Sequence, residues 1–265
     1  MSDTSDRGAS AKETRDGARR LSDLANPTKF LVMADRILPW LAGAAFVVLA
    51  VALWLGFAAP EDFQQGITVR IMYIHVPFAW LSMLCYSLMA LAALGTLVWR
   101  HPLADVALKA AAPIGAVFTA LALVTGSIWG KPMWGTWWVW DARLTSVFVL
   151  FLMYLGLMAL NRAMDDPTRA AKVSAILILV GFVNIPIIKF SVDWWNTLHQ
   201  PASVIRMDGP TIDGEFLRPL LVMAIAFTLF FFTLHILAMR NEILRRRVAV
   251  LRRLAARQAG QRGAA

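Results

Sequence analysis

Residues 219–239 read PLLVMAIAFTLFFFTLHILAM, an apolar run without Asp, Glu, Lys or Arg. A helix that crosses the hydrocarbon core of a bilayer needs about 20 mostly apolar residues, and this run meets that length. Five further runs share its character: 37–59, 71–99, 110–130, 144–161 and 173–188. The chain as a whole is 58% hydrophobic, with a mean hydropathy of +0.59. The sequence therefore predicts an all-α integral membrane bundle of six transmembrane helices.

Two of these runs, 144–161 and 173–188, fall slightly short of a full crossing, and we expect flanking residues to lengthen them. The connections between the runs are short, which predicts one bundle over 37–240 rather than several domains. Polar residues dominate on both sides of it, in an N-terminal tail over 1–36 and a basic C-terminal tail over 241–265.

The basic residues predict the orientation in the membrane. With six spans both termini lie on one side, and that side carries 20 of the 26 Lys and Arg residues. Because Lys and Arg concentrate in cytoplasmic flanks and short loops, we expect both termini in the cytoplasm. Most of the net charge of +9 comes from the tail between Arg240 and Arg262. We expect that tail to face the anionic cytoplasmic leaflet rather than nucleic acid.

Between the third and fourth predicted helices, residues 129–141 read WGKPMWGTWWVWD and hold five of the eleven tryptophans. We call them the tryptophan segment. By the orientation above it faces outward, toward the periplasm of a bacterium. A helical spacing of i, i+3, i+4 and i+7 is shared by Trp134, Trp137, Trp138 and Asp141. If the segment is helical, this spacing predicts an amphipathic helix with its tryptophans on one face.

Such a cluster, ending in Asp141 and Arg143, suggests a binding surface for a flat, apolar and partly anionic ligand, and haem fits that description. Arg143 offers a planar donor fork for a propionate, with Asp141 holding the guanidinium in place. Gly130 and Gly135 let backbone and ligand approach closely. Two alternatives stay open at this point. The tryptophans can form an aromatic belt at the membrane surface, and the Asp141–Arg143 contact can be purely structural.

Two histidines lie on the same predicted outer side, His75 before the tryptophan segment and His199 after it. Each is followed two residues later by a proline, Pro77 or Pro201. Proline disfavours helical geometry in the residue before it, so we expect both histidines near helix boundaries, facing a shared cavity. Neutral imidazole binds iron well, and haem iron accepts a side chain from each face. The pair is a candidate axial pair, and two unrelated interfacial histidines are the alternative.

The run WGTWWVWDARLT at 134–145 resembles the WWD signature of the haem-handling proteins of cytochrome c biogenesis. Within that group, the chain length, the six spans and one outer histidine on each side of the motif resemble the CcmC family, haem exporter protein C. The resemblance covers about residues 36–240. Its larger relatives, the CcmF-type and CcsA-type haem lyase proteins, have more spans than this chain can hold.

The resemblance implies a haem-presenting transfer factor of the bacterial inner membrane rather than an enzyme. His75 and His199 would be the axial ligands of the iron of haem b, and the stretch 129–146 would hold the porphyrin. The implied haem-binding residues are His75, His199, Trp134, Gly135, Trp137, Trp138, Trp140, Asp141 and Arg143. The implied partners are the periplasmic haem chaperone CcmE, the small membrane subunit CcmD and an ABC-type complex of CcmA and CcmB.

Two rival functions remain. A transporter that moves haem across the bilayer needs a polar path, and the spans offer little beyond Thr125, Ser127, Asn184 and Pro186. Asn184 and Pro186 interrupt the fifth span, and we expect a packing kink there rather than a broken helix. In the second rival the tryptophan segment only docks the chaperone, because Trp is favoured at interface hot spots.

Overall fold

The structure, a computed structural model, describes residues 26–263. Its elements are α2 (Pro27–Ala58), η1 (Ile67–Ile71), α3 (Met72–Val98), α4 (Pro102–Trp134), α5 (Ala142–Ala163), α6 (Pro167–Gly181), α7 (Asn184–Trp194) and α8 (Gly214–Gly263). Together they provide six helical spans long and apolar enough to cross a membrane, with α6 and α7 counted as one. No strand forms within residues 26–263. The predicted all-α, six-span architecture is confirmed.

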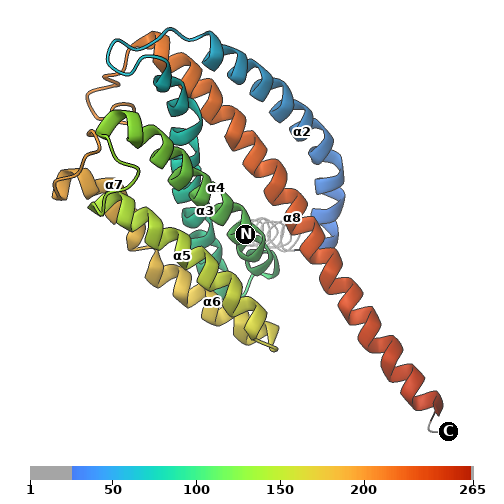
Figure 1. The fold of residues 1–265 in the computed structure, drawn as a ribbon. Coiled ribbons are helices and arrows are strands. Elements are labelled where there is room, and N and C mark those ends of the chain that lie inside the picture. Colours follow the sequence, from blue (N-terminus) through green and yellow to red (C-terminus); the bar gives the residue numbers. More distant parts are fainter. Residues whose placement is uncertain (1–25, 264–265) are drawn as a thin grey trace, which may run out of the picture.

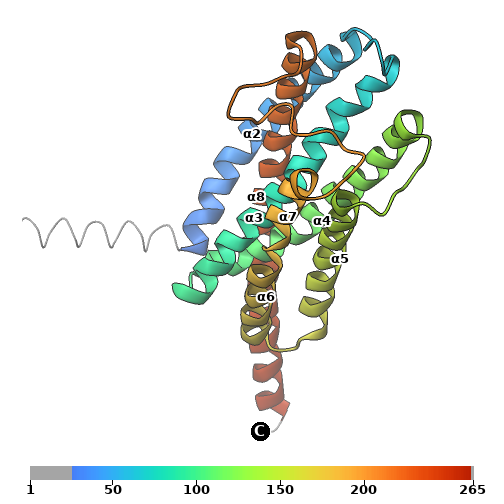
Figure 2. The ribbon, with the colours of Figure 1, turned by 90° about the vertical axis from the view of Figure 1, so that its left-hand side faces the viewer.

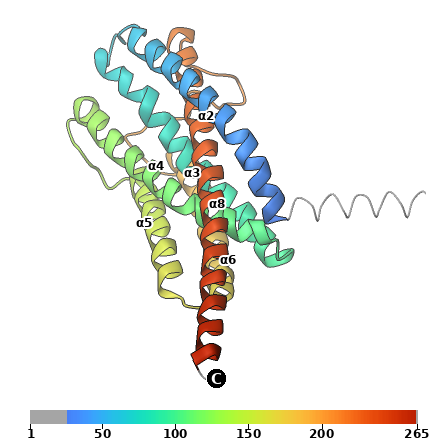
Figure 3. The same cartoon turned by 90° about the vertical axis from the view of Figure 1, so that its right-hand side faces the viewer.

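The helices extend beyond the apolar runs because capping residues, rather than hydropathy, fix their ends. At the start of α2 the side chain of Asn26 accepts a hydrogen bond from the Thr28 amide, and Pro27 occupies the first helical position. Asn and Pro are favoured at these two positions. At the other terminus α8 continues well past the membrane-length apolar run (Figure 3). Of the two expected tails, residues 1–25 and 264–265 lie outside the described part of the chain.

The helices pack most extensively in two pairs, α3 with α4 and α2 with α8, and α3 and α4 lie in the middle of the bundle (Figure 1). The links α2–α3, α4–α5 and α7–α8 gather at one end, and the links α3–α4 and α5–α6 at the opposite end (Figures 1 and 2). We call these the tryptophan end and the basic end. The two candidate histidines and the tryptophan segment share the tryptophan end.

Tyr154 holds α3, α4 and α5 together in the core. Its hydroxyl donates a 2.8 Å hydrogen bond to the carbonyl oxygen of Ser82, and the side chain is fully buried. Its ring lies so close to Gly115 of α4 that a Cβ there would overlap the phenol. A bulky polar ring with a satisfied hydroxyl is a stable way to fill a membrane core. This contact fixes the three helices whose other ends carry the site.

The fifth span bends between α6 and α7 without unwinding. Phe182 and Val183 keep right-handed helical angles, and the amide of Ile185 still donates to the Phe182 carbonyl at 3.0 Å. The side chain of Asn184 donates to the Ser146 carbonyl of α5 at 2.9 Å, which ties the bend to its neighbour. The expected packing kink is confirmed. The kink places α7 against the end of α5 that adjoins the tryptophan segment.

Candidate functional site

The tryptophan segment is not one helix. α4 ends at Trp134, and residues 135–141 are irregular until α5 begins. Gly135 takes the left-handed conformation, with φ at 74°, and its amide donates to the Lys131 carbonyl at 3.0 Å. Glycine adopts this geometry without strain and commonly ends helices. The expected amphipathic helix over 134–141 is therefore wrong: the spacing fits a helical period, but the glycine stops the helix.

Asp141 connects the end of this segment to the loop that carries His199. One carboxylate oxygen accepts a 2.7 Å hydrogen bond from the Leu144 amide and so caps the start of α5. The other lies 3.2 Å from Nδ1 of His199. The Asp141 side chain is only 5% exposed. An ionised carboxylate can only accept, so Nδ1 of His199 carries the hydrogen and Nε2 keeps its lone pair.

His199 lies in the irregular loop 195–213, against the edge of Trp134, with ring centroids 4.9 Å apart. Burial lowers the pKa of His199 below its ordinary value, and the Asp141 carboxylate opposes part of that lowering. The imidazole is thus neutral at neutral pH. A neutral ring with Nδ1 held by a carboxylate and Nε2 unprotonated is the form in which histidine binds metals.

His75 lies in the first turn of α3, where η1 gives way to α-helix. Its Nδ1 is 3.1 Å from the hydroxyl oxygen of Thr125 in α4. That hydroxyl donates its own hydrogen to the Leu121 carbonyl at 2.6 Å, so it can only accept from the imidazole. Nδ1 of His75 therefore carries the hydrogen, and Nε2 is again the free nitrogen. Two unrelated contacts hold both histidines in the same tautomer.

The His75 ring lies flush against α4 because Gly126 has no side chain. A Cβ at Gly126 would come within 2.9 Å of the imidazole Cε1. One turn further on, Trp129 meets the same ring edge-on, with centroids 5.6 Å apart. The indole nitrogen of Trp129 donates to the Gln65 side chain at 3.1 Å, which fixes its orientation. The last turns of α4 thus contact both histidines, since Trp134 meets His199.

The two imidazoles share the tryptophan end, and each meets a tryptophan from the last turns of α4. Three residues outside the predicted site complete their surroundings: Gln65, Thr125 and Gly126. A signal for two of them exists, because Thr125-Gly126-Ser127 is a small polar triplet in an otherwise apolar run. Gln65 belongs to the link before η1 and has no local signal.

The remaining tryptophans of the segment do not share one surface. Trp138 packs edge-on against Trp140 at 5.3 Å and against Phe148 of α5 at 6.1 Å. Trp137 and Trp140 are 57% and 72% exposed. Among Trp134, Trp137, Trp138 and Trp140, only Trp134 makes a ring contact with a candidate ligand, while Trp129 at the start of the segment contacts His75. The structure thus divides the expected surface into an inner tryptophan beside His199 and an outer group that faces away from the core.

Arg143 does not form the expected direct ion pair with Asp141. Its Nε donates to the Ser191 hydroxyl of α7 at 3.1 Å, and one terminal nitrogen donates to the Lys189 carbonyl at 3.4 Å. The second terminal nitrogen has no partner among the described residues. Arg143 therefore ties α5 to α7 and keeps one donor available, while Asp141 serves His199 instead.

Comparisons with known proteins identify the family of this chain. The family model described as CcmC, Heme exporter protein C, matches residues 20–254. A Heme exporter protein C of Bradyrhizobium diazoefficiens is 70% identical over 236 residues, which cover 89% of this chain and 90% of the relative. Heme exporter protein C of Escherichia coli K12 is 50% identical over 227 residues, 85% of this chain and 91% of the relative.

A more distant organism carries a similar chain. A putative cytochrome c biosynthesis ccmC-like mitochondrial protein of Marchantia polymorpha is 48% identical over 210 residues, 79% of this chain and 88% of the relative. The family-model match over residues 20–254 reaches into all six helical spans and includes the region of both candidate histidines. The chain therefore belongs to the CcmC family and is a multi-pass protein of the inner membrane.

Proposed function

We propose that this protein binds haem b at the periplasmic face of the inner membrane and presents it to the haem chaperone CcmE. Its relatives are named for haem export and for cytochrome c biosynthesis, so the family handles haem in cytochrome c maturation. CcmD and the CcmA–CcmB complex are the further partners that we propose. The tryptophan end would face the periplasm, because the opposite side carries 20 of the 26 basic residues.

One observation carries the proposal: both histidines at the tryptophan end are held through Nδ1, by Asp141 and by Thr125, with Nε2 left free. A hydrogen-bonded partner on the far nitrogen is what metal-binding histidines almost always have. Haem iron accepts axial ligands from opposite faces, which suits one histidine on α3 and one on a loop. His75 and His199 would hold the iron in this way.

The other predicted residues would hold the porphyrin around that axis. Trp134 would border it beside His199, and Trp129 would do so beside His75. The exposed rings of Trp137 and Trp140, with Trp138 packed beneath Trp140, would give the outer mouth an apolar surface. The free donor of Arg143 suits a propionate. Gly135 sets the turn that brings these rings back over α5. A vinyl group at the open side would then be available to the chaperone.

A docking subunit that does not ligate haem is the second candidate. The exposure of Trp137 and Trp140 favours it, because large exposed aromatic rings are typical anchors of protein interfaces. A path for haem through the bundle has less support: fully buried Tyr86, Tyr154 and Phe231 fill the described core. We therefore propose haem presentation, with the exposed tryptophans also contacting the chaperone.

The deciding experiment is the visible absorption spectrum of the detergent-purified protein, oxidised and reduced. We expect a low-spin, six-coordinate haem spectrum that is lost or altered in both His75→Ala and His199→Ala. His101→Ala is the matched control, because His101 lies at the basic end, before α4, and should leave the spectrum unchanged. A colourless wild type that still captures the chaperone would overturn haem ligation and support the docking subunit.

A further inference from the structure

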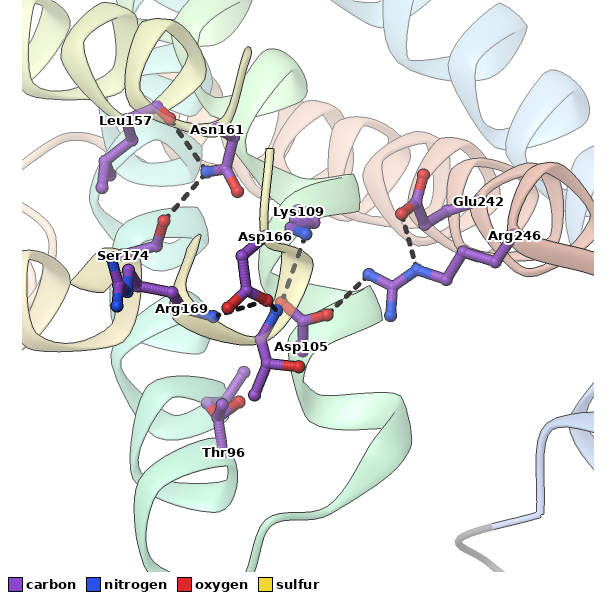
Figure 4. Close-up of polar contacts among 12 residues, drawn as sticks. Thr96, Asp105, Lys109, Leu157, Asn161, Asp166, Arg169, Ser174, Glu242 and Arg246 are labelled. Carbon is purple, nitrogen blue, oxygen red and sulfur yellow. Dashed lines mark hydrogen bonds and ion pairs between the residues drawn. The ribbon is translucent and has the colours of Figure 1, made fainter. Parts of the chain in front are cut away.

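At the basic end, far from the histidines, α4, α5 and α8 border an open polar hollow of about 480 Å³. Its polar wall consists of Lys109 of α4, Asn161 and Arg162 of α5, and Glu242 and Arg245 of α8. Figure 4 shows Lys109 and Asp105 on α4 facing Glu242 and Arg246 of α8, with Asn161 on the neighbouring α5. None of these residues takes part in the proposed haem site.

Two carboxylates beside the hollow are already neutralised by α8. Arg246 donates to Asp105 at 2.6 Å and to Glu242 at 2.7 Å, so one guanidinium bridges α4 and α8. Arg245 lies 2.7 Å from the other oxygen of Glu242. The side chains of Asp105 and Glu242 are only 14% and 12% exposed. Both acidic groups of the cluster are therefore engaged in ion pairs that hold the helices together.

The basic side chains at the hollow outnumber the two acidic ones. The ammonium of Lys109 is 3.8 Å from Asp105, too far for a hydrogen bond, yet its side chain is only 16% exposed. Arg162 makes no hydrogen bond or ion pair within residues 26–263. A shielded ammonium without a hydrogen-bonded partner is costly. The hollow therefore has two basic side chains whose charge suits an anionic group.

Asn161 lies on the wall of the hollow and joins α5 to α6. The Asn161 amide nitrogen donates to the Leu157 carbonyl at 2.9 Å and to the Ser174 hydroxyl at 3.0 Å. Its carbonyl oxygen Oδ1 is buried and has no partner in the described chain. Asn161 is therefore a structural contact between α5 and α6, and the basic side chains define the complementary ligand as an anion.

The lining of the hollow changes from polar to apolar with depth, as a lipid-binding site requires. Below the polar wall, about one turn nearer the middle of the bundle, its lining becomes apolar: Ala112 and Pro113 of α4 and Met158 of α5. A charged mouth above an apolar floor suits a ligand with a polar head and a hydrocarbon body. Basic pockets between transmembrane helices near the cytoplasmic surface are known to hold anionic lipid head groups.

We propose that this hollow binds the phosphodiester head group of an anionic glycerophospholipid such as phosphatidylglycerol. Lys109 and Arg162 hold the phosphate. The bound lipid wedges between α4, α5 and α8 beside the Arg246 bridge. This inference is independent of haem binding, because it concerns the opposite end of the bundle.

The test is native mass spectrometry of the full chain in detergent, titrated with phosphatidylglycerol or with phosphatidylcholine of the same acyl chains. We expect wild type to retain one phosphatidylglycerol in preference to phosphatidylcholine. Lys109→Gln combined with Arg162→Gln should weaken that retention about tenfold. Arg162→Gln alone, at an exposed residue without a hydrogen bond or ion pair in residues 26–263, should weaken it about threefold and guards against misfolding of the double variant.

The matched control is Arg252→Gln with Arg253→Gln, which removes the same charge from the exposed extension of α8 and should leave retention unchanged. Equal loss in this control, equal retention in the double variant, or equal binding of both lipids would overturn the proposal. Displacement of the lipid by millimolar inorganic phosphate would identify a free-anion site and also overturn it. Undisturbed lipid in phosphate supports the head-group site.

Discussion

The carboxylate of Asp141 lies 3.2 Å from Nδ1 of His199, while its other oxygen caps α5. One side chain therefore orients a candidate iron ligand from the first turn of a transmembrane helix. The arrangement gives the loop histidine a rigid reference point, although the loop itself has no regular secondary structure. It also makes the electrostatics of His199 depend on a single, nearly buried partner.

Asp141→Asn should lower the pKa of His199 still further, because the carboxylate raises it against the lowering by burial. Since a folded-state pKa below the ordinary 6.5 favours the neutral ring, His199 becomes protonated only as the pH falls through that lowered value. The pH at which His199 becomes protonated should therefore be lower in the variant than in wild type. Histidine nitrogen NMR of the haem-free protein measures this directly.

The same substitution should weaken haem binding about 10–100-fold at neutral pH, through the lost orientation of the imidazole. Asp193→Asn is the matched control, an exposed acid on α7 at the same end of the bundle. A rise in the His199 pKa in the Asp141 variant, or equal effects of both substitutions, would contradict the assigned role.

Gly126→Ala should displace His75, because the new methyl group would sit 2.9 Å from the imidazole Cε1. We expect loss of the six-coordinate haem spectrum with little change in the amount of folded protein. Gly156→Ala is the control, since a Cβ at Gly156 of α5 meets no atom within 4 Å. An unaltered spectrum in the Gly126 variant would show that His75 does not bind iron in this position.

Thr125→Val keeps the shape of the side chain but removes the acceptor for Nδ1 of His75. The imidazole then loses its fixed tautomer, and haem affinity should fall about tenfold, as measured by titration of the haem-free protein. Thr119→Val is matched to it, because the Thr119 hydroxyl only donates to the Gly115 carbonyl within α4. If both valine variants bound haem like wild type, the hydrogen bond would have no role in ligation.

Gly135→Ala should destabilise the protein by about 1 kcal/mol, since an L side chain is strained at a φ of 74°. The readout is the midpoint of thermal unfolding in detergent. Gly135→Asn should cost less, because asparagine tolerates the left-handed conformation. Equal losses for alanine and asparagine would point to a packing effect instead of backbone strain.

The six spans were predictable because lipid imposes a length and an apolar composition that can be read from the sequence. The ends of the helices were less predictable from the sequence. Apolar runs mark where lipid contacts a helix, whereas Asn26 and Gly135 mark where the backbone starts or stops being helical. The wrong expectation of a helix over 134–141 has this cause: the spacing of the tryptophans fits a helical period, but Gly135 ends the helix.

The site was predictable in its residues but not in its pairings. His75 and His199 could be singled out by their neighbours in the sequence, and Asp141 and Arg143 by their charge. The partner of each lies on another element: Thr125 for His75, and Ser191 for Arg143. Such contacts depend on how helices cross, and no local spacing encodes a crossing. Gly126 belongs to the same class, since its role exists only where α3 touches α4.

The two imidazoles are anchored in mechanically different ways. His75 is part of α3 and lies against α4 at Gly126, so its backbone can move only together with a helix. His199 belongs to an irregular loop, where rotation about a few backbone bonds is enough to withdraw the ring. Unloading of the site would therefore begin at the loop, with His199 as the detachable ligand and His75 as the fixed one.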